Sequence, residues 1–311
     1  MRYLSSLLRN GGLRRRIVPS YCAGNPSLSA RFSSHTEQRV TLSVDSDGIA
    51  HVQLNRPDKL NALDLPMFEA LRSVGQELQS KPQIRVVILS GNGRAFCTGL
   101  DVQSILRNNP LQSMERLLER RNDEVTNLAQ MVAYQWRQLP VPVVAVLHGM
   151  CFGGGLQIAL GADFRYCTPE CQLSIMETKW GLIPDMSMTV TLRELVRIDV
   201  AKELTMTGRI VQGEEAEALG LVTRCVKDPH HEAQTLAHAL IQKSPDAVAL
   251  TKQLYQQTWV DCSESDALLL ETKLQRRLLK SWNQMAATGR VFGVNVPYWN
   301  RKETKEGEVK K

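Results

Sequence analysis

The sequence predicts an α/β fold with a mostly parallel sheet and a helical C-terminal part. Up to Val226, short apolar runs rich in β-branched residues alternate with longer segments whose apolar residues recur at helical spacing. After Val226 the strand signals end. The chain has 311 residues, of which 43% are hydrophobic and 23% are charged, and this composition excludes wholesale disorder and collagen-like structure.

The body of the chain begins with a predicted hairpin, a helix and a buried strand. Thr41–Val44 and Ile49–Leu54 are predicted strands around the turn Asp45-Ser46-Asp47-Gly48. Leu65–Leu78 has apolar residues at helical spacing, and Ile84–Leu89 is an apolar run typical of a buried strand.

The next elements continue the alternation of strands and helices. Residues 103–138 are predicted to be mostly helical, and Val141–Leu147 to be a buried strand despite Pro142. A helix is expected over Leu156–Leu160, and a strand over Phe164–Cys167. This order predicts βαβ units and therefore a mostly parallel sheet.

The C-terminal part is predicted to contain three helices, over His231–Gln242, Pro245–Trp259 and Ser263–Met285. Ser244 precedes the second helix, and Ser263 starts the third with a Ser-x-x-Asp pattern that is typical of a helix start. We therefore expect an α/β core over residues 37–226 and a helical region over residues 227–311.

Residues 1–36 have the composition of a mitochondrial transit peptide. They hold six arginines, many serines and no Lys, Asp or Glu. Arg31-Phe32-Ser33-Ser34 looks like a processing site, which predicts a mature chain in the mitochondrial matrix that starts between Ser33 and Glu37. The alternative is a basic tail without a targeting role.

Charge and cysteine content narrow the function classes. Removing the six leader arginines from the 38 basic residues leaves a body whose basic residues equal its 32 acidic ones. No basic face for nucleic acid is therefore expected, and no stretch is apolar for the roughly 20 residues that a membrane span needs. The seven cysteines are odd in number and scattered, which predicts buried thiols, with no disulfide framework and no metal site.

Two glycine-rich turns each follow a predicted buried strand. One contains Gly153-Gly154-Gly155 and leads into a helix, and the other is GNGRAFCTGLD, residues 91–101. Glycine lets a ligand approach the backbone closely, and free N–H groups at a helix start bind negative oxygen. Two such turns offering one N–H each to the same oxygen would form an oxyanion hole. The alternative for either turn alone is a structural role.

Three further segments accompany these turns. The five occur in the order LNRPDKLNAL (54–63), GRAFCTGLD (93–101), HGMCFGGGLQIALGADFRY (148–166), METKWGLIPD (176–185) and LTMTGRIVQGEEAEALGLV (204–222). Together, over roughly residues 38–290, they resemble the crotonase (enoyl-CoA hydratase/isomerase) superfamily, and among its members the motifs are most similar to dienoyl-CoA isomerases.

The resemblance implies a spiral of ββα units that binds an acyl-CoA thioester and forms its enolate. The thioester carbonyl would accept hydrogen bonds from the N–H groups of Leu100 and Gly154. The CoA is part of the substrate, so no separate cofactor is implied. The other residues that the resemblance places against the substrate are Thr98, Gly99, Asp101, Val102, Gly153 and Gln157.

The first segment resembles the loop of this family that binds CoA. The resemblance places Arg56, Lys59, Leu60, Ala62 and Arg94 against the CoA part of the substrate, with the three cationic side chains as candidates for its phosphates. For any one of these cations the alternative is solvated surface charge.

The acidic residues present at two positions indicate which reaction of the family to expect. Hydratases of this family carry two glutamates, and the matching positions here hold Gln157 and Glu177. An amide neither accepts nor donates a proton at ordinary pH, so chemistry with two acids is not expected. Glu177 is predicted to be the base, in a dry pocket formed by Met176, Trp180 and Ile183 that raises its pKa.

Asp185 lies eight residues after Glu177, where dienoyl-CoA isomerases of the family keep a catalytic aspartate. The same spacing occurs in the family's 3-hydroxyacyl-CoA thioester hydrolases. A structural role for both acids, as helix caps or partners of Lys179 or Arg193, is the alternative.

We therefore expect double-bond isomerisation of an unsaturated fatty enoyl- or dienoyl-CoA, with Glu177 as acid/base and Asp185 assisting. The alternatives are an enoyl-CoA hydratase in which Gln157 acts through a bound water, a thioester hydrolase, and a non-catalytic paralogue that binds CoA or RNA. The resemblance also implies a homotrimer or homohexamer, with the C-terminal helices covering an active site or a neighbouring subunit.

Overall fold

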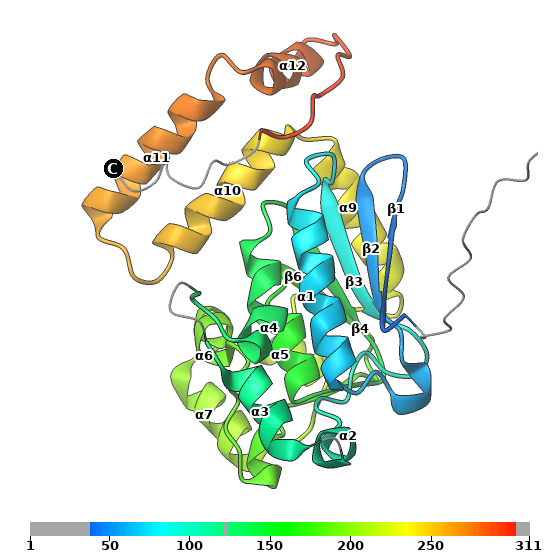
Figure 1. Ribbon diagram of the computed structural model, residues 1–311. Coiled ribbons are helices and arrows are strands. Elements are labelled where there is room, and N and C mark those ends of the chain that lie inside the picture. Colours follow the sequence, from blue (N-terminus) through cyan, green and yellow to red (C-terminus); the bar gives the residue numbers. More distant parts are fainter. Residues whose placement is uncertain (1–37, 108, 121–123, 303–311) are drawn as a thin grey trace, which may run out of the picture. The chain divides into compact units, whose positions relative to one another are not determined.

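The computed structural model describes residues 38–107, 109–120 and 124–302, so the predicted leader and its processing site lie outside the described residues. The main sheet has the strand order β1-β2-β3-β4-β6-β9, and all neighbouring pairs are parallel except β1 and β2 (Figure 1). This confirms the predicted α/β fold. The strands are β1 (Val40–Val44), β2 (Ile49–Leu54), β3 (Val86–Gly91), β4 (Val143–Leu147), β6 (Phe164–Cys167) and β9 (Arg224–Cys225).

A second, three-stranded sheet has the order β5-β7-β8. Its strands are β5 (Met150–Phe152), β7 (Gln172–Ser174) and β8 (Val211–Gln212). The bridge between Cys97 and Cys151 joins β5 to the turn that follows β3. The two glycine-rich turns are therefore connected by backbone pairing.

The helices of the described chain cover both faces of the main sheet. In β3, Val87 and Leu89 belong to the larger hydrophobic cluster, whereas Val86 and Ile88 belong to a second cluster with Ala233. Strands buried on both faces need apolar residues at every position, which explains their unbroken apolar runs. The first helices are α1 (Leu65–Gln79), α2 (Val102–Arg107), α3 (Pro110–Leu118), α4 (Leu128–Gln138), α5 (Gly154–Leu160), α6 (Met188–Thr191), α7 (Ile198–Thr207) and α8 (Gly213–Leu219).

After β9 the described chain continues only as helices. They are α9 (Pro229–Ile241), α10 (Pro245–Thr258), α11 (Glu264–Leu278) and α12 (Trp282–Val291), and three short 3-10 turns occur earlier in the chain, η1 (Pro57–Lys59), η2 (Glu177–Trp180) and η3 (Leu192–Glu194). The helix α9 packs on β3, β4 and β6. None of the described helices is both long and apolar enough to span a membrane.

The segment 103–138 is mostly helical, as predicted, and contains three helices, because Pro110 starts α3 and Asn127 caps α4. One predicted helix at the C-terminal end is interrupted, and there the sequence interpretation was wrong. The predicted third C-terminal helix is two helices. Lys280 between them has a left-handed φ of 66°, and the Ser281 side chain accepts a hydrogen bond from the Gln284 N–H and begins α12.

One buried lysine connects the C-terminal helices to the core. Lys252 on α10 donates from Nζ to the Asp163 carboxylate at 2.7 Å and to the carbonyl oxygens of Trp136 and Val141 at 2.9 Å. Its side chain is 7% exposed. All three ammonium hydrogens therefore have acceptors within the core.

We expect Lys252→Met to lower the free energy of unfolding by about 3 kcal/mol, because it leaves a half-buried carboxylate and two carbonyls without their donor. Urea denaturation followed by circular dichroism measures this loss. Lys202→Met, at an exposed position of α7, is the matched control and should change stability little. Equal effects of the two substitutions would contradict the assignment.

Candidate active site

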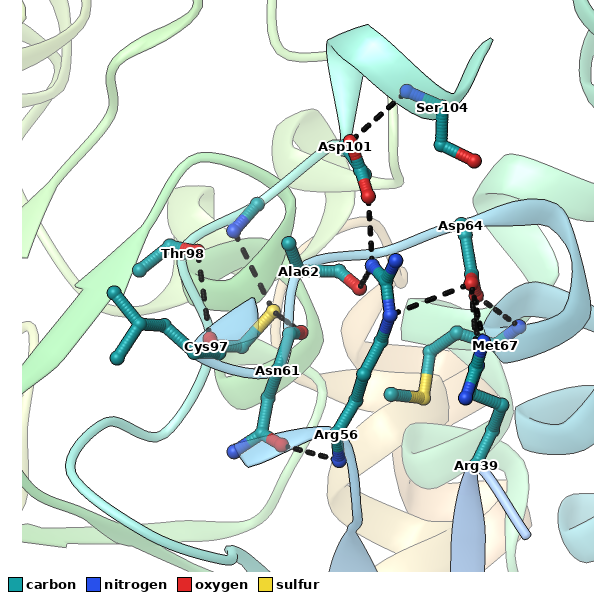
Figure 2. Close-up of polar contacts among 12 residues, drawn as sticks. Arg39, Arg56, Asn61, Ala62, Asp64, Met67, Cys97, Thr98, Asp101 and Ser104 are labelled. Atoms are coloured by element: carbon teal, nitrogen blue, oxygen red, sulfur yellow. Dashed lines mark hydrogen bonds and ion pairs between the residues drawn. The ribbon is translucent and has the colours of Figure 1, made fainter. Parts of the chain in front are cut away.

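A buried asparagine holds together the loops that follow β2 and β3. Asn61 accepts a hydrogen bond at Oδ1 from the Arg56 N–H at 2.8 Å, and its Nδ2 donates to the carbonyls of Asn92 and Ala95, both at 2.9 Å. The Cys97 thiol donates to the Asn61 carbonyl at 3.1 Å (Figure 2). The amide nitrogen of this side chain therefore joins the two loops, and its oxygen fixes the loop after β2 to which Asn61 itself belongs.

Arg56 has interior partners rather than a free guanidinium. Only 9% of the residue is exposed, and its Nη1 donates to Asp101 at 2.8 Å and to the Ala62 carbonyl at 3.0 Å. Its Nε lies 3.4 Å from Asp64, which caps α1 by accepting the Met67 N–H (Figure 2). The sequence predicted a CoA contact for Arg56 and a substrate contact for Asp101, and the structure pairs these two side chains with each other.

Leu100 is one of the two predicted donors of the oxyanion hole, and its N–H points away from the segment around Leu63 that pairs with it. Leu63 donates its N–H to the Gly99 carbonyl at 2.8 Å, and its own carbonyl accepts the Asp101 N–H at 3.0 Å. In such a parallel bridge Leu63 bonds to both neighbours of Leu100, so the Leu100 N–H points to the opposite side. It has no hydrogen-bond acceptor in the described part of the chain.

The second predicted donor, Gly154, is the first residue of α5 and lies close to this turn. Its N–H belongs to the first turn of the helix and has no intrahelical acceptor. A Cβ built on Gly99 would lie 3.4 Å from the Gly154 nitrogen and 3.0 Å from the Phe152 carbonyl oxygen. A Cβ on Gly154 itself would lie 2.8 Å from the sulfur of Met186. The two unpaired N–H groups therefore come from turns in direct contact.

Glu177 and Gln157 lie beside these turns and contact each other. Gln157 on α5 is 1% exposed, and its Nε2 donates to Oε1 of Glu177 at 2.6 Å. Its Oε1 accepts the Met186 N–H at 2.8 Å. Oε2 of Glu177 is buried without a hydrogen-bond partner among the described residues. A Cβ on Gly153 would lie 3.2 Å from Oε1 of Glu177, so this carboxyl packs against the glycine turn.

Both acids bind protons more readily than ordinary carboxyl groups. Burial raises the pKa of Glu177, the Gln157 hydrogen bond opposes that rise, and the nearby charge of Asp185 adds to it. Partial burial also raises the pKa of Asp185. A carboxyl group with a raised pKa is suited to accept and return a proton near neutral pH.

Of the three residues expected to dry this pocket, Met176 is half-buried, and the choice of the other two was wrong. Trp180 is 64% exposed and Ile183 is 75% exposed, because η2 and the chain after it turn these side chains to solvent. The burial of Glu177 comes instead from the neighbourhood of Gln157 and Gly153. Arg193, considered as an ion-pair partner for the acids, pairs with Asp261 at 3.0 Å.

The remaining predicted contacts are on the two joined loops. Lys59 and Arg94 are exposed, and a Cβ on Gly93 would lie 2.7 Å from the Cβ of Pro57, so their turns are adjacent. The Thr98 N–H donates to the Leu60 carbonyl at 3.2 Å. Val102 begins α2.

A cavity of about 640 Å³ is lined by parts of α4, α5, β6 and α10, and neither Glu177 nor Asp185 lines it. Of its charged groups, Lys252 pairs with Asp163, Arg137 pairs with Glu194, and Arg165 donates to the carbonyls of Ala162 and Leu221. No group of three or more His, Cys, Asp or Glu side chains in the described ranges is arranged to hold a metal ion. The acids and the glycine turns therefore form a separate candidate site.

Comparison with known proteins identifies the family of this chain. The sequence profile of the enoyl-CoA hydratase/isomerase family matches residues 45–289. The peroxisomal Delta(3,5)-Delta(2,4)-dienoyl-CoA isomerase of Arabidopsis thaliana is 33% identical over 231 residues, which cover 71% of this chain and 81% of that protein. The mitochondrial enoyl-CoA hydratase domain-containing protein 2 of Bos taurus is 30% identical over 259 residues, or 81% of this chain and 83% of that protein.

The fold is also shared with solved structures. The crystal structure of an enoyl-CoA hydratase from Bacillus anthracis matches with a TM-score of 0.76 at 25% identity, covering 85% of this chain and 100% of that chain. The likeness covers the α/β body that carries the two glycine turns.

Sequence reasoning did not single out Asn61, although it lies inside a quoted motif. We expect Asn61→Ala to lower the free energy of unfolding by about 2 kcal/mol, because three buried backbone groups lose their partner. Urea denaturation measures this change. Asn92→Ala, which removes an exposed asparagine side chain from the same pair of loops, is the control and should cost much less. A neutral Asn61→Ala would show that the loops hold their positions without it.

Proposed function

The chain belongs to the enoyl-CoA hydratase/isomerase family, and on that premise we propose that it moves a carbon–carbon double bond along an unsaturated fatty enoyl- or dienoyl-CoA. It is an enzyme of the enoyl-CoA isomerase/hydratase type. One observation carries the choice between these reactions: an amide, Gln157, hydrogen-bonds the Glu177 carboxyl from the position where hydratases of this family carry their other glutamate.

Isomerisation needs a polarised thioester and a proton carrier. The N–H groups of Leu100 and Gly154 would hold the thioester oxygen and stabilise the negative charge that develops on it. Glu177 would take a proton from the carbon next to the thioester, and the C–H electron pair would form the enolate. Return of a proton at the far end of the conjugated system, with Asp185 assisting, then moves the double bond without gain or loss of atoms.

Hydration is disfavoured by the same geometry. Water addition needs one group to activate the water and another to supply a proton, and the Gln157 amide does neither at ordinary pH. One of the two lone pairs of its oxygen already accepts the Met186 N–H, and its NH₂ group donates to Glu177. The balanced charge of the body and the paired interior cations also give no support to RNA binding.

The substrate's CoA would lie along the joined loops. Lys59 and Arg94 are exposed on adjacent turns and would contact its phosphates, with Leu60 and Ala62 beside them. Arg56 would act indirectly, because its ion pairs with Asp101 and Asp64 hold the loop that carries Lys59.

The cellular setting follows from the leader and the relatives. An Arg-rich leader and a relative named as mitochondrial support a role in the mitochondrial matrix, in the β-oxidation of unsaturated fatty acids. Another relative is named as peroxisomal. Exposed apolar side chains on α10 and α11, such as Trp259 and Leu268, support assembly into a homotrimer or homohexamer.

Product analysis tests the reaction directly. Protein starting near Ser34 is incubated with 3-enoyl-, 3,5-dienoyl-, 2-enoyl- and 3-hydroxyacyl-CoA, and products are followed by mass and ultraviolet absorbance. A product of unchanged mass with a shifted double bond is expected. Gain of one water in mass would establish a hydratase, release of free CoA thiol would establish a hydrolase, and no turnover of any substrate would establish a binding role.

We expect Glu177→Gln to reduce double-bond migration roughly 100-fold or more, because the amide cannot accept the proton. The raised pKa of Glu177 also predicts that wild-type activity is lost as pH falls through that pKa, since the protonated carboxyl is no base. Initial rates across a pH series check both statements. Full turnover by the variant would remove Glu177 from the mechanism.

A further inference from the structure

The orientation of the Gln157 amide is determined by its neighbours. The Met186 backbone nitrogen is a donor only, so the atom that meets it at 2.8 Å must be the amide oxygen. The amide NH₂ must then face Glu177, where it donates to Oε1 at 2.6 Å. A backbone group that cannot change its role therefore determines which end of Gln157 touches the carboxyl.

This contact makes the two oxygens of Glu177 different. Oε1 accepts a hydrogen bond from the Gln157 amide, which stabilises negative charge on that oxygen and makes it the less basic of the two. Oε2 is buried and has no partner among the described residues. A buried oxygen without a donor is the atom of the pair that gains most from binding a proton.

We propose that Gln157 is a positioning residue for the proton transfer: held by Met186, it occupies Oε1 of Glu177 and leaves Oε2 as the atom that carries the proton. The inference rests on the proposed function and adds to it the identity of the transferring atom. In the transfer, the C–H bond next to the thioester breaks, an O–H bond forms at Oε2, and the electron pair stays in the enolate. Gln157 keeps both of its own protons throughout.

Gln157 is the side chain that hydrogen-bonds the Glu177 carboxyl, and the backbone N–H groups of Glu177 and Met176 also stabilise its charged form. Asp185 is the one charged group that acts on the Glu177 carboxyl within the described residues. On its own turn, Lys179 is exposed. From α7, which packs against η2, Thr205 accepts a hydrogen bond from Thr178, and the exposed Glu203 pairs with Arg209.

Infrared titration of the free enzyme tests the inference without turnover. The protonated carboxyl band of Glu177 is assigned by its disappearance in Glu177→Gln. In Gln157→Met, which has similar size but no donor, the midpoint of this band is expected at higher pH than in the wild type, because the charged form has lost its hydrogen bond. In Gln157→Glu the protonated band should also persist to higher pH, since two carboxyls in contact share a proton.

Gln135→Met is the matched control. Gln135 on α4 is a buried glutamine whose Nε2 donates to the Leu71 carbonyl at 2.9 Å, and it makes no contact with either acid. Because Gln135→Met makes the same chemical change at a buried position, it should lower stability without moving the protonated carboxyl band of Glu177. The acidic limb of the pH–rate profile should shift upward in Gln157→Met and stay in place in Gln135→Met.

The outcomes separate this inference from the proposed function. An unmoved Glu177 band in Gln157→Met would overturn the positioning role, even in a protein that isomerises its substrate. If the band moves in Gln157→Met but the wild-type protein does not shift a double bond, the Gln157–Glu177 contact is supported and the proposed reaction is overturned.

Discussion

The site depends on a backbone contact so close that only glycine fits. The turn after β3 and the turn before α5 pack directly on each other. A Cβ on Gly155 would lie 2.5 Å from the Cys97 carbonyl oxygen, and one on Gly149 would overlap the carbonyl oxygen of Arg94. Because no side chain separates the turns, the N–H groups of Leu100 and Gly154 come from neighbouring backbone segments. A hole built from main-chain donors on two strand-end turns is rigid, and so it needs little reorganisation when charge develops.

A second constraint is the pairing of buried polar groups around these turns. Asn61 joins two loops through its amide nitrogen, and Arg56 lies between two carboxylates and a carbonyl. Such groups are costly to bury unless every partner is present. The network therefore stabilises one arrangement of the loops. The polar groups around Glu177 are not all paired in this way, since one buried oxygen of Glu177 has no hydrogen-bond partner among the described residues. A buried polar atom that lacks a partner beside satisfied groups is typical of a reactive site.

The sequence predicted the strands and the glycine turns well because their signals are local. An unbroken apolar run indicates a strand buried on both faces of a sheet, and a glycine indicates a position where another group approaches the backbone closely, whatever that group is. The helix ends were predicted less well, since the break at Lys280 depends on one residue's left-handed φ. The environment of Glu177 was predicted wrongly. Trp180 and Ile183 are its neighbours in sequence, but a 3-10 turn directs them to solvent.

By itself, the sequence determined the fold class, the family and the types of residue available for chemistry, above all an amide at 157 and a carboxyl at 177. These follow from local patterns and from ordered motifs. Only the tertiary structure decided which groups touch. Arg56 meets Asp101 from 45 residues away, and the Gln157 amide is oriented by a backbone N–H 29 residues later. Side-chain partners of this kind are set by how loops pack in space, and residue spacing along the chain does not record that packing.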